Sequence, residues 1–368
     1  MINENRLVDA FMSYVKISSP SCYEGEFALF LMTTLKNLGL TVEMDEAGNM
    51  LQSNSGNIIA KLKGTLRGKP ILFSAHMDTV NPGHDIEPVR SEGFIHSSGQ
   101  TILGADDKAG IACIIEALAC IKETKCAHRD LEIVFTIFEE GGLNGSKHLS
   151  PQKLKAHSGY VLDSSTPPGH IITKGPSQNK LEFSVKGLAA HAGVSPEKGI
   201  SAIGVASEAI RNMKLLRIDE DTTANIGVIS GGVATNIVMP EVNIIAEARS
   251  LDPEKLLYQT RHMIACFEDA AKVHETTVKS DVQTLYPILN IEDDAPVVKH
   301  ALEAFKACNL TATLAKTGGG SDAHIFSANG IPTVNLGIGV KKAHTVNEHI
   351  AISDMVTMAN VTLALMTR

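Results

Sequence analysis

Histidine and acidic side chains follow several apolar strands of this sequence. His76 and Asp78 stand at the end of an apolar run that begins at Ile71. Residues two apart on a strand point to the same side, so both side chains can face the space beyond the strand. A carboxylate behind an imidazole fixes the tautomer of a metal-binding histidine. A hydrogen-bonded histidine at a strand end is the simpler alternative.

Two further acidic positions follow the same arrangement. Glu139 and Glu140 come after the apolar stretch 131–138, and Asp163 comes after the apolar residues 161–162. Adjacent carboxylates at a partly buried strand end repel each other, so a positive partner is expected nearby. A pair of metal ions would supply that charge, whereas an ordinary polar turn is the alternative.

Asp106 and Asp107 open a helix that the sequence predicts over 107–122. An aspartate at this position can cap the helix through hydrogen bonding and favourable electrostatics. One acid is enough for a cap, which leaves the other for a different task. His344 follows a glycine turn at 337–339 and, taken alone, could equally be structural.

The elements that carry these side chains alternate between strand and helix. Strands at 70–77, 131–138 and 159–162 each finish on a histidine or an acid. Such alternation predicts an α/β fold with a mixed sheet covered by helices, and binding sites in open α/β sheets lie at strand ends. Histidine, aspartate and glutamate offer the nitrogen and oxygen donors that divalent metals bind, and zinc accepts this mixture. The sequence therefore predicts a metal site.

The middle of the chain has a different pattern of predicted strands and helices. Residues 181–186 alternate between apolar and polar, and 242–247 do so more loosely, with helical patterns between and after them. The order of strand, helix, strand, strand, helix and strand predicts a small α+β sandwich inserted into the first domain. The expected domains are 1–178 together with 288–368, and the insert 179–287.

The composition excludes several classes of function. The chain has 368 residues, more than one hydrophobic core usually organises. Hydrophobic content of 43% and charged content of 20% are typical of globular proteins. A formal charge of −8 without any basic run argues against nucleic-acid binding. No apolar stretch is long enough to cross a bilayer, which argues against a membrane protein.

Cysteine usage favours a reducing compartment. The six cysteines are scattered and include no Cys-x-x-Cys pair, and Cys113 and Cys120 lie in an apolar helical pattern typical of buried thiols. The first residues show no signal-peptide pattern. A cytoplasmic location is therefore expected.

Together these segments resemble the M20 family of co-catalytic zinc aminopeptidases and carboxypeptidases, and most of all its tripeptide aminopeptidase (peptidase T) branch. The match spans almost the whole chain in the right order, and the joint pattern is far more specific than any single piece. The family's lid or dimerisation domain also corresponds to the insert. The segments that carry the resemblance are 74–79, 103–110, 138–142, Asp163, 319–323 and His344.

The resemblance implies a role for each residue at the strand ends. His76 and Asp163 would bind one Zn²⁺, Glu140 and His344 would bind the other, and Asp106 would bridge them, followed by a cis peptide bond. Co²⁺ or Mn²⁺ could substitute for zinc. The resemblance also implies two catalytic residues. Asp78 would orient His76, and Glu139 would be the general base that accepts a proton from the water between the metals.

In the insert, the resemblance implies substrate contacts. His191 resembles the family's oxyanion-binding lid histidine, Asn236 its substrate-contacting asparagine, and Arg249 the arginine that grips a substrate carboxylate. A strand-end histidine, a turn asparagine and a surface arginine are the ordinary alternatives. Gly319, in the loop 318–320, would approach the substrate backbone unless this loop is a plain turn.

These implied roles predict a two-zinc hydrolase that cleaves short peptides from the amino end, with tripeptides as model substrates. The chain departs from the peptidase T branch at Ser164 and Ser165, where glycines are typical, and it is somewhat shorter, so strict tripeptide specificity stays open. An N-acyl amino acid amidohydrolase with the same metal site is the alternative. A catalytically inactive binding homologue is a third, although it would have no need of Glu139. The resemblance also leaves open a homodimer formed through the insert.

Overall fold

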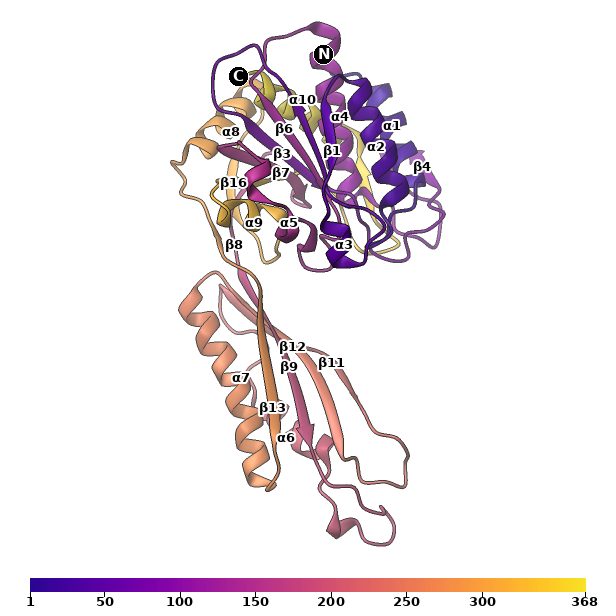
Figure 1. Ribbon diagram of the computed structural model, residues 1–368, viewed down its shortest axis with the longest axis vertical. Helices are drawn as coiled ribbons and strands as arrows, with labels where there is room; N and C mark the ends of the chain where they lie inside the picture. Colours follow the sequence, from indigo (N-terminus) through magenta and orange to yellow (C-terminus); the bar gives the residue numbers. More distant parts are fainter. The chain divides into compact units, whose positions relative to one another are not determined.

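The computed structural model describes all residues from Met1 to Arg368 and divides into two compact units (Figure 1). The first unit contains Met1–Lys174 and Leu289–Arg368, and the second is the continuous segment Gly175–Ile288. The domain boundaries expected from the sequence were after residues 178 and 287. Each unit has its own hydrophobic core.

A mixed sheet of nine strands organises the first unit. Its strands are β1 (Thr41–Met44), β2 (Ile58–Leu62), β3 (Ile71–His76), β6 (Leu131–Thr136), β7 (Ser158–Ser164), β8 (His170–Gly175), β14 (Leu289–Asn290), β15 (Thr313–Lys316) and β16 (Thr333–Gly337). The order is β1-β2-β6-β3-β7-β16-β8-β14, with β15 paired to β8. Strands β6, β3, β7 and β16 run parallel to one another, so their carboxyl ends meet at one edge. Every residue of β3 and β6 is buried, because helices cover both faces as the sequence predicts.

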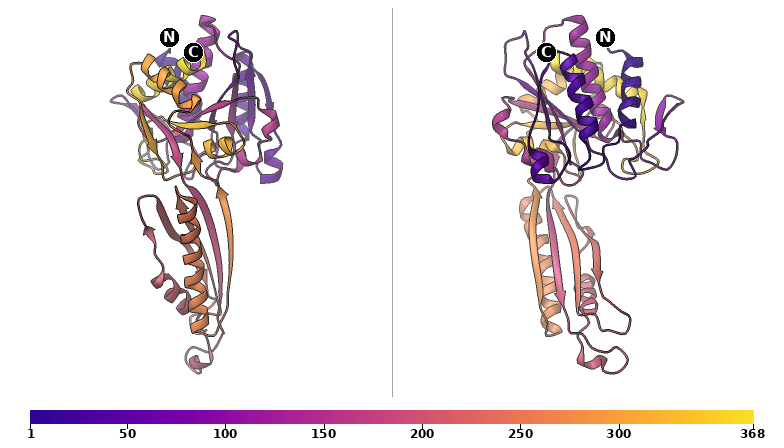
Figure 2. Two further views of the ribbon diagram at one scale, coloured as in Figure 1. Left: turned by 90° about the vertical axis from the view of Figure 1, so that its left-hand side faces the viewer. Right: turned by 45° about the vertical axis from the view of Figure 1, so that its right-hand side comes forward.

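Eight α-helices belong to the first unit. They are α1 (Glu4–Lys16), α2 (Gly25–Asn37), α3 (Ala47–Leu51), α4 (Ala105–Thr124), α5 (Asn144–His148), α8 (Pro296–Ala307), α9 (Asp322–Ala328) and α10 (Ile352–Thr367). Helix α4 packs on β3 and β7, and α1 and α10 pack on α4 (Figure 2). Helix α1 begins where the Asn3 side chain accepts a hydrogen bond from the Arg6 amide. No helix combines the length and the apolar character needed to span a lipid bilayer.

A small antiparallel sheet lies apart from the large one within the first unit. It contains β4 (Pro88–Ser91), β5 (Phe94–Ser97) and β17 (His349–Ala351), in the order β17-β5-β4. The sequence interpretation did not include this sheet, because strands of three or four residues carry too little alternation to be recognised. Its last strand matters for the site, since β17 follows the loop that carries His344.

The second unit is an antiparallel sheet with two helices on one face. Its elements are β9 (Ser177–Lys186), α6 (Ala202–Asn212), β10 (Leu216–Arg217), β11 (Thr222–Gly231), β12 (Glu241–Ser250), α7 (Pro253–Val273) and β13 (Val278–Tyr286). The sheet order is β10-β11-β12-β9-β13. Phe183 of β9 stacks on Phe267 of α7 with ring centroids 4.2 Å apart. The Asp252 side chain caps α7, as the sequence Asp252-Pro253-Glu254 predicts.

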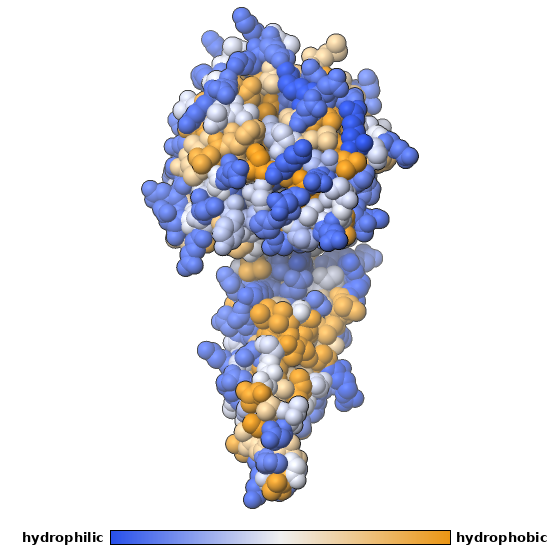
Figure 3. Space-filling model, turned by 90° about the vertical axis from the view of Figure 1, so that its right-hand side faces the viewer, coloured by the Kyte–Doolittle hydropathy of each residue, from blue (hydrophilic) through white to orange (hydrophobic).

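Apolar side chains are also exposed on the strands of the second unit. Val228 and Ile229 on β11, Ile245 on β12 and Val282 on β13 are each at least 37% exposed. Figure 3 shows apolar side chains gathered on one side of this unit. Val228 and Ile245 are paired and so share one face of the sheet, whereas Ile229 and Val282 pair with the buried residues Ile244 and Leu181 and lie on the other face.

Candidate metal centre

His76 is the last residue of β3 and is almost completely buried. Its Nδ1 atom lies 2.9 Å from the main-chain carbonyl oxygen of Asp78 and 3.5 Å from the Asp78 carboxylate. An Nδ1–H group donating to this carbonyl leaves the Nε2 lone pair as the ligand atom. Nε2 lies 3.1 Å from Asp106 Oδ1 and 3.9 Å from Asp163 Oδ1.

The adjacent acids Asp106 and Asp107 have different roles: one caps the helix, and the other is free for the metal site. Asp107 Oδ1 accepts a hydrogen bond from the Gly110 amide, which caps the regular part of α4. The Asp106–Asp107 peptide bond is cis, and both residues have non-helical backbone angles. Asp106 turns its two oxygens to two histidines, with Oδ1 3.1 Å from His76 Nε2 and Oδ2 3.3 Å from His344 Nε2.

Two buried carboxylates hold the turn that carries Glu139 and Glu140. Asp78 accepts hydrogen bonds from the Glu139 amide (2.9 Å) and the Glu140 amide (3.2 Å). Glu24 accepts from the Phe138 amide at 3.0 Å. Both Asp78 and Glu24 have no exposed surface. Asp78 therefore positions this turn as well as flanking His76, a second task that the sequence interpretation did not include.

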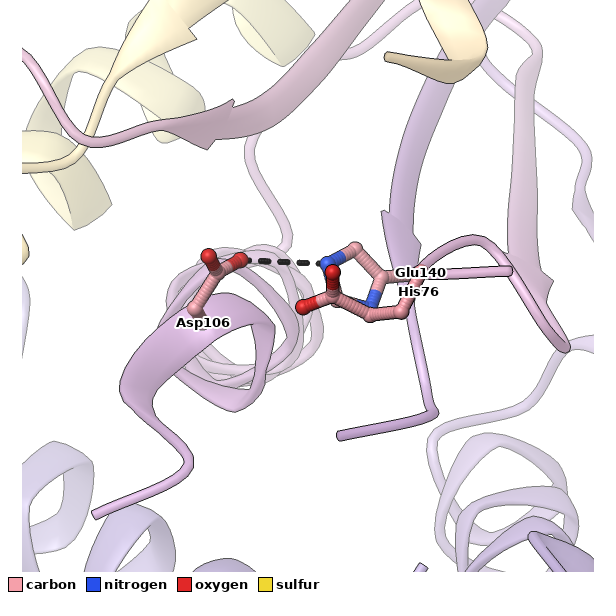
Figure 4. A group of neighbouring side chains, drawn as sticks. All are labelled: His76, Asp106 and Glu140. Atoms are coloured by element: carbon pink, nitrogen blue, oxygen red, sulfur yellow. Dashed lines mark hydrogen bonds and ion pairs between the residues drawn. The ribbon is translucent and has the colours of Figure 1, made fainter. Parts of the chain in front are cut away.

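The remaining two residues come from β7 and from the loop before β17. The backbone amide of Asp163, near the end of β7, donates a hydrogen bond to Asn335 Oδ1 of the neighbouring strand β16. His344 has a left-handed backbone (φ 63°) and places Nε2 2.8 Å from Glu140 Oε1. Figure 4 shows the contact between Asp106 and the His76 ring as a dashed line, and the Glu140 ligand atom lies within 4.8 Å of both.

The electrostatics of this cluster show an excess of negative charge. Burial raises the pKa of Glu139 well above its usual range, with a further increase from Asp163 and an opposing effect of His76. Burial also raises the pKa of Asp163, and the charge on Asp106 adds to it. Hydrogen bonds that the His344 ring donates to the Asp106 and Glu140 carboxylates raise the pKa of His344 to about 10. Carboxylates crowded in this way need a cation to remain ionised together.

The donor atoms fit divalent metal ions. His76, Asp106 and Glu140 place ligand atoms within 4.8 Å of one another, as do His76, Asp107 and Asp163. Two ligands each about 2.0–2.1 Å from a tetrahedral zinc lie roughly 3.3 Å apart, close to the separations found here. Glu140 Oε1 is buried and lies 2.8 Å from His344 Nε2, so these two ligand atoms face the same space.

Comparison with known proteins agrees with this geometry. The model of peptidase family M20/M25/M40 matches residues 72–368. The chain belongs to this family. The M20 resemblance drawn from the sequence is thereby confirmed, and the chain is a metallopeptidase by family.

Three relatives of this M20 peptidase illustrate how far the similarity extends. The uncharacterized protein YqjE of Bacillus subtilis is 43% identical over 365 residues, covering 99% of this chain and 98% of the relative. The crystal structure of aminopeptidase PepT from Bacillus cereus matches with a TM-score of 0.91 and 42% identity, over 100% of this chain and 98% of that one. A tripeptidase from Staphylococcus aureus matches with a TM-score of 0.95 and 40% identity, at the same coverage.

Two acidic residues of the M20 peptidase act near the site without having been proposed from the sequence as site residues. Asp322, at the start of α9, accepts hydrogen bonds from the hydroxyls of Thr136 on β6 and Ser146 on α5. It thereby anchors the end of the 318–320 loop, in which the Gly319 amide donates to Thr317 Oγ1 at 3.2 Å. Glu348 accepts three main-chain hydrogen bonds beside Asp106. Only their partners, which lie far away in the sequence, identify these residues.

The insert residues lie in two separate places of the second unit. A main-chain bridge joins His191 to Ile237, and the Ala192 amide donates to the Asn236 carbonyl, so His191 and Asn236 are neighbours beyond the end of β9. Arg249 lies at the opposite end of β12, where its guanidinium binds the Glu247 carboxylate through two contacts of 3.0 Å.

Proposed function

We propose that this M20 peptidase is a two-metal aminopeptidase that hydrolyses short peptides, tripeptides among them. The observation that carries the proposal is the position of Asp106, whose two oxygens face His76 and His344 in one cluster with Glu140 and Asp163. A carboxylate presented in this way suits a ligand shared by two metals. The similarity to PepT of Bacillus cereus and to the Staphylococcus aureus tripeptidase supports the substrate class.

Five side chains would hold the metals. His76 and Asp163 would bind one ion, Glu140 and His344 the other, and Asp106 both. The nitrogen and oxygen donors favour Zn²⁺, with Co²⁺ or Mn²⁺ as substitutes. When bound, the metals would polarise the scissile carbonyl and stabilise the charge that develops on its oxygen.

Glu139 would act as the general base. The residue is 8% exposed, and its turn is fixed by the hydrogen bond from its amide to Asp78. Burial raises its pKa well above the usual range, and a carboxylate with a raised pKa can both accept a proton from the attacking water and return it to the leaving amine.

The insert would bind the substrate from two chains. Arg249 would receive the peptide carboxylate, and His191 with Asn236 would contact the peptide near the reacting carbonyl. Arg249 pairs with Gln178, and the other end of β12, near His191, pairs with Lys186. Eight residues of strand separate these ends, which is about 26 Å, whereas an extended tripeptide spans about 10 Å.

One chain therefore does not supply both groups to the same tripeptide, and we infer a homodimer formed through the insert. Val228 of β11 and Ile245 of β12, which are exposed and paired on one face of the sheet, favour such contact. We also infer a cytoplasmic location, since all six cysteines are free thiols.

Metal analysis combined with a substrate panel tests the proposed reaction. We expect two metal ions per chain, hydrolysis of tripeptides with release of the amino-terminal residue, and little turnover of N-acetyl amino acids. Glu139→Gln should retain both metals and lower kcat by about 10²–10⁴-fold, because it removes only the proton acceptor. Faster turnover of N-acetyl amino acids than of tripeptides would favour the amidohydrolase alternative. An unchanged kcat in Glu139→Gln would reject the assignment of the base.

A mixing experiment tests the shared site. Glu139→Gln and His191→Ala should each be inactive as pure dimers. A mixed dimer contains one chain of each variant. The intact Glu139 of the His191→Ala chain can then work with the intact His191 of the Glu139→Gln chain, so activity should return at one of the two sites. Mixed dimers that stay inactive would contradict a site in which His191 comes from the partner chain.

A further inference from the structure

Glu348 is a buried carboxylate to which the proposed catalytic steps assign no role. It is 1% exposed and lies four residues after His344, directly before β17. Its Oε2 atom accepts hydrogen bonds from the amides of Leu103 and Gly104, each at 2.9 Å. Its Oε1 atom accepts from the Asp106 amide at 3.0 Å.

The loop that carries Glu348 is closed at its base. Lys341 and His349 exchange two main-chain hydrogen bonds of 2.8 and 3.1 Å, and the Glu348 amide donates to the Thr345 carbonyl at 3.0 Å. His344 lies within this loop and contacts Asp106 Oδ2. The loop therefore touches the Asp106 segment twice, once through the His344 ring and once through the Glu348 carboxylate.

The amides bound by Glu348 lie at the beginning of α4. The first amides of a helix have no partner within the helix, and a negative charge there is favourable. Gly104, with a left-handed backbone (φ 71°), precedes α4 and offers no side-chain cap. Glu348 supplies the acceptors for these amides, which precede the regular part of α4 that Asp107 caps, from the same loop that supplies the ligand His344. The Glu348 side chain thus connects the backbone of the ligand Asp106 to the loop that carries the ligand His344.

We propose that Glu348 is a positioning residue that fixes the Asp106 backbone against the His344 loop and so sets the spacing of these two ligands. The proposal rests on the metal-dependent function inferred above. It predicts that removing the carboxylate charge impairs metal binding beyond any general loss of stability. Altering residues that hydrogen-bond to metal ligands typically changes metal affinity by about 10–100-fold.

The test compares Glu348→Gln with the matched variant Glu132→Gln. Glu132 is 3% exposed and its Oε2 atom also accepts two main-chain hydrogen bonds, from Lys155 (2.8 Å) and Ala156 (2.9 Å). It lies near the beginning of β6, away from the strand ends that carry the ligands. In both variants an amide group replaces a charged acceptor, so both should lose thermal stability.

Co²⁺ titration followed by visible absorption and calorimetry provides a readout besides activity. We expect wild type and Glu132→Gln to bind two Co²⁺ with the same spectrum, and Glu348→Gln to bind at least one of them about 10–100-fold more weakly with an altered spectrum. If Glu348→Gln does not fold, Glu348→Asp and Glu132→Asp give the same comparison.

Unchanged Co²⁺ affinity and spectrum in the folded Glu348 variant would overturn the inference, and so would an equal change in the Glu132 variant. Failure of the wild-type protein to bind Co²⁺ would instead overturn the proposed metal centre, and this inference with it. The two failures are therefore distinguishable.

Discussion

Replacing Asp78 by asparagine should weaken both the fold and the metal centre. The Asp78 carboxylate is fully buried and accepts hydrogen bonds from the Glu139 amide, the Glu140 amide and the Ser21 hydroxyl. Burial opposes its charge, but hydrogen bonding and attraction to His76 outweigh this effect and hold the pKa of Asp78 below its usual value. The ionised form therefore stabilises the native state at neutral pH.

The size of the effect follows from the hydrogen bonds. Asparagine offers one carbonyl oxygen, and its NH₂ group would face a second amide donor. At least one main-chain amide of the Glu139–Glu140 turn then lacks an acceptor, which costs about 1–3 kcal/mol. Because the same turn carries a ligand and the base, metal affinity should also fall by about 10–100-fold.

Urea unfolding of the metal-free protein measures the first effect, and calorimetric titration with Zn²⁺ measures the second. Asp45→Asn is the matched control, since Asp45 also accepts hydrogen bonds from two main-chain amides, those of Ala47 and Asn57. The control should lose stability and keep its Zn²⁺ affinity. If Asp78→Asn loses stability but binds Zn²⁺ as tightly as the wild-type protein, the reasoning about the Glu139–Glu140 turn is refuted.

Three other positions give two independent expectations. Gly110→Ala should destabilise the protein by at least about 2 kcal/mol in urea unfolding, because the new methyl group would lie 2.2 Å from the Leu162 carbonyl oxygen. Gly204→Ala in α6, where the nearest atom is 3.5 Å away, should instead stabilise by about 0.5–1 kcal/mol; a similar loss at both positions would contradict this contrast. Burial lowers the pKa of Lys108 to about 7, below the unfolded value, so its contribution to stability should rise as the pH increases from about 7 toward 10. Lys108→Met should lack this rise in pH-dependent unfolding of the metal-free protein, and a variant that retains it would assign the rise to another group.

The sequence predicts the ends of the strands well because apolar runs and the polar residues that follow them are local features. Strand β3 ends at His76 and strand β6 ends three residues before Glu139, close to the expected positions. The paired acids Asp106 and Asp107 were also informative, since a helix needs one cap and the structure uses Asp107 for it. At the ends of β3 and β6 and at the Asp106–Asp107 pair, the local sequence pattern agrees with the structure.

Residues that act over a long distance in the sequence could not be found in this way. Glu348 binds an amide 245 positions away, and Glu24 binds the Phe138 amide 114 positions away. Neither residue is marked by periodicity or by a neighbouring acid. Asp78 was expected to support His76, but its hydrogen bonds to the Glu139–Glu140 turn depend on a tertiary contact between β3 and β6. The short strands β4, β5 and β17 were missed for lack of a pattern long enough to read.

The most direct test of the account is an anomalous diffraction map at the zinc absorption edge from crystals grown with Zn²⁺. We predict two peaks per chain: one in contact with His76 and Asp163, the other in contact with Glu140 and His344, and both in contact with Asp106. A single peak, or a peak that any of these five side chains fails to contact as assigned, would contradict the proposed pair of metals.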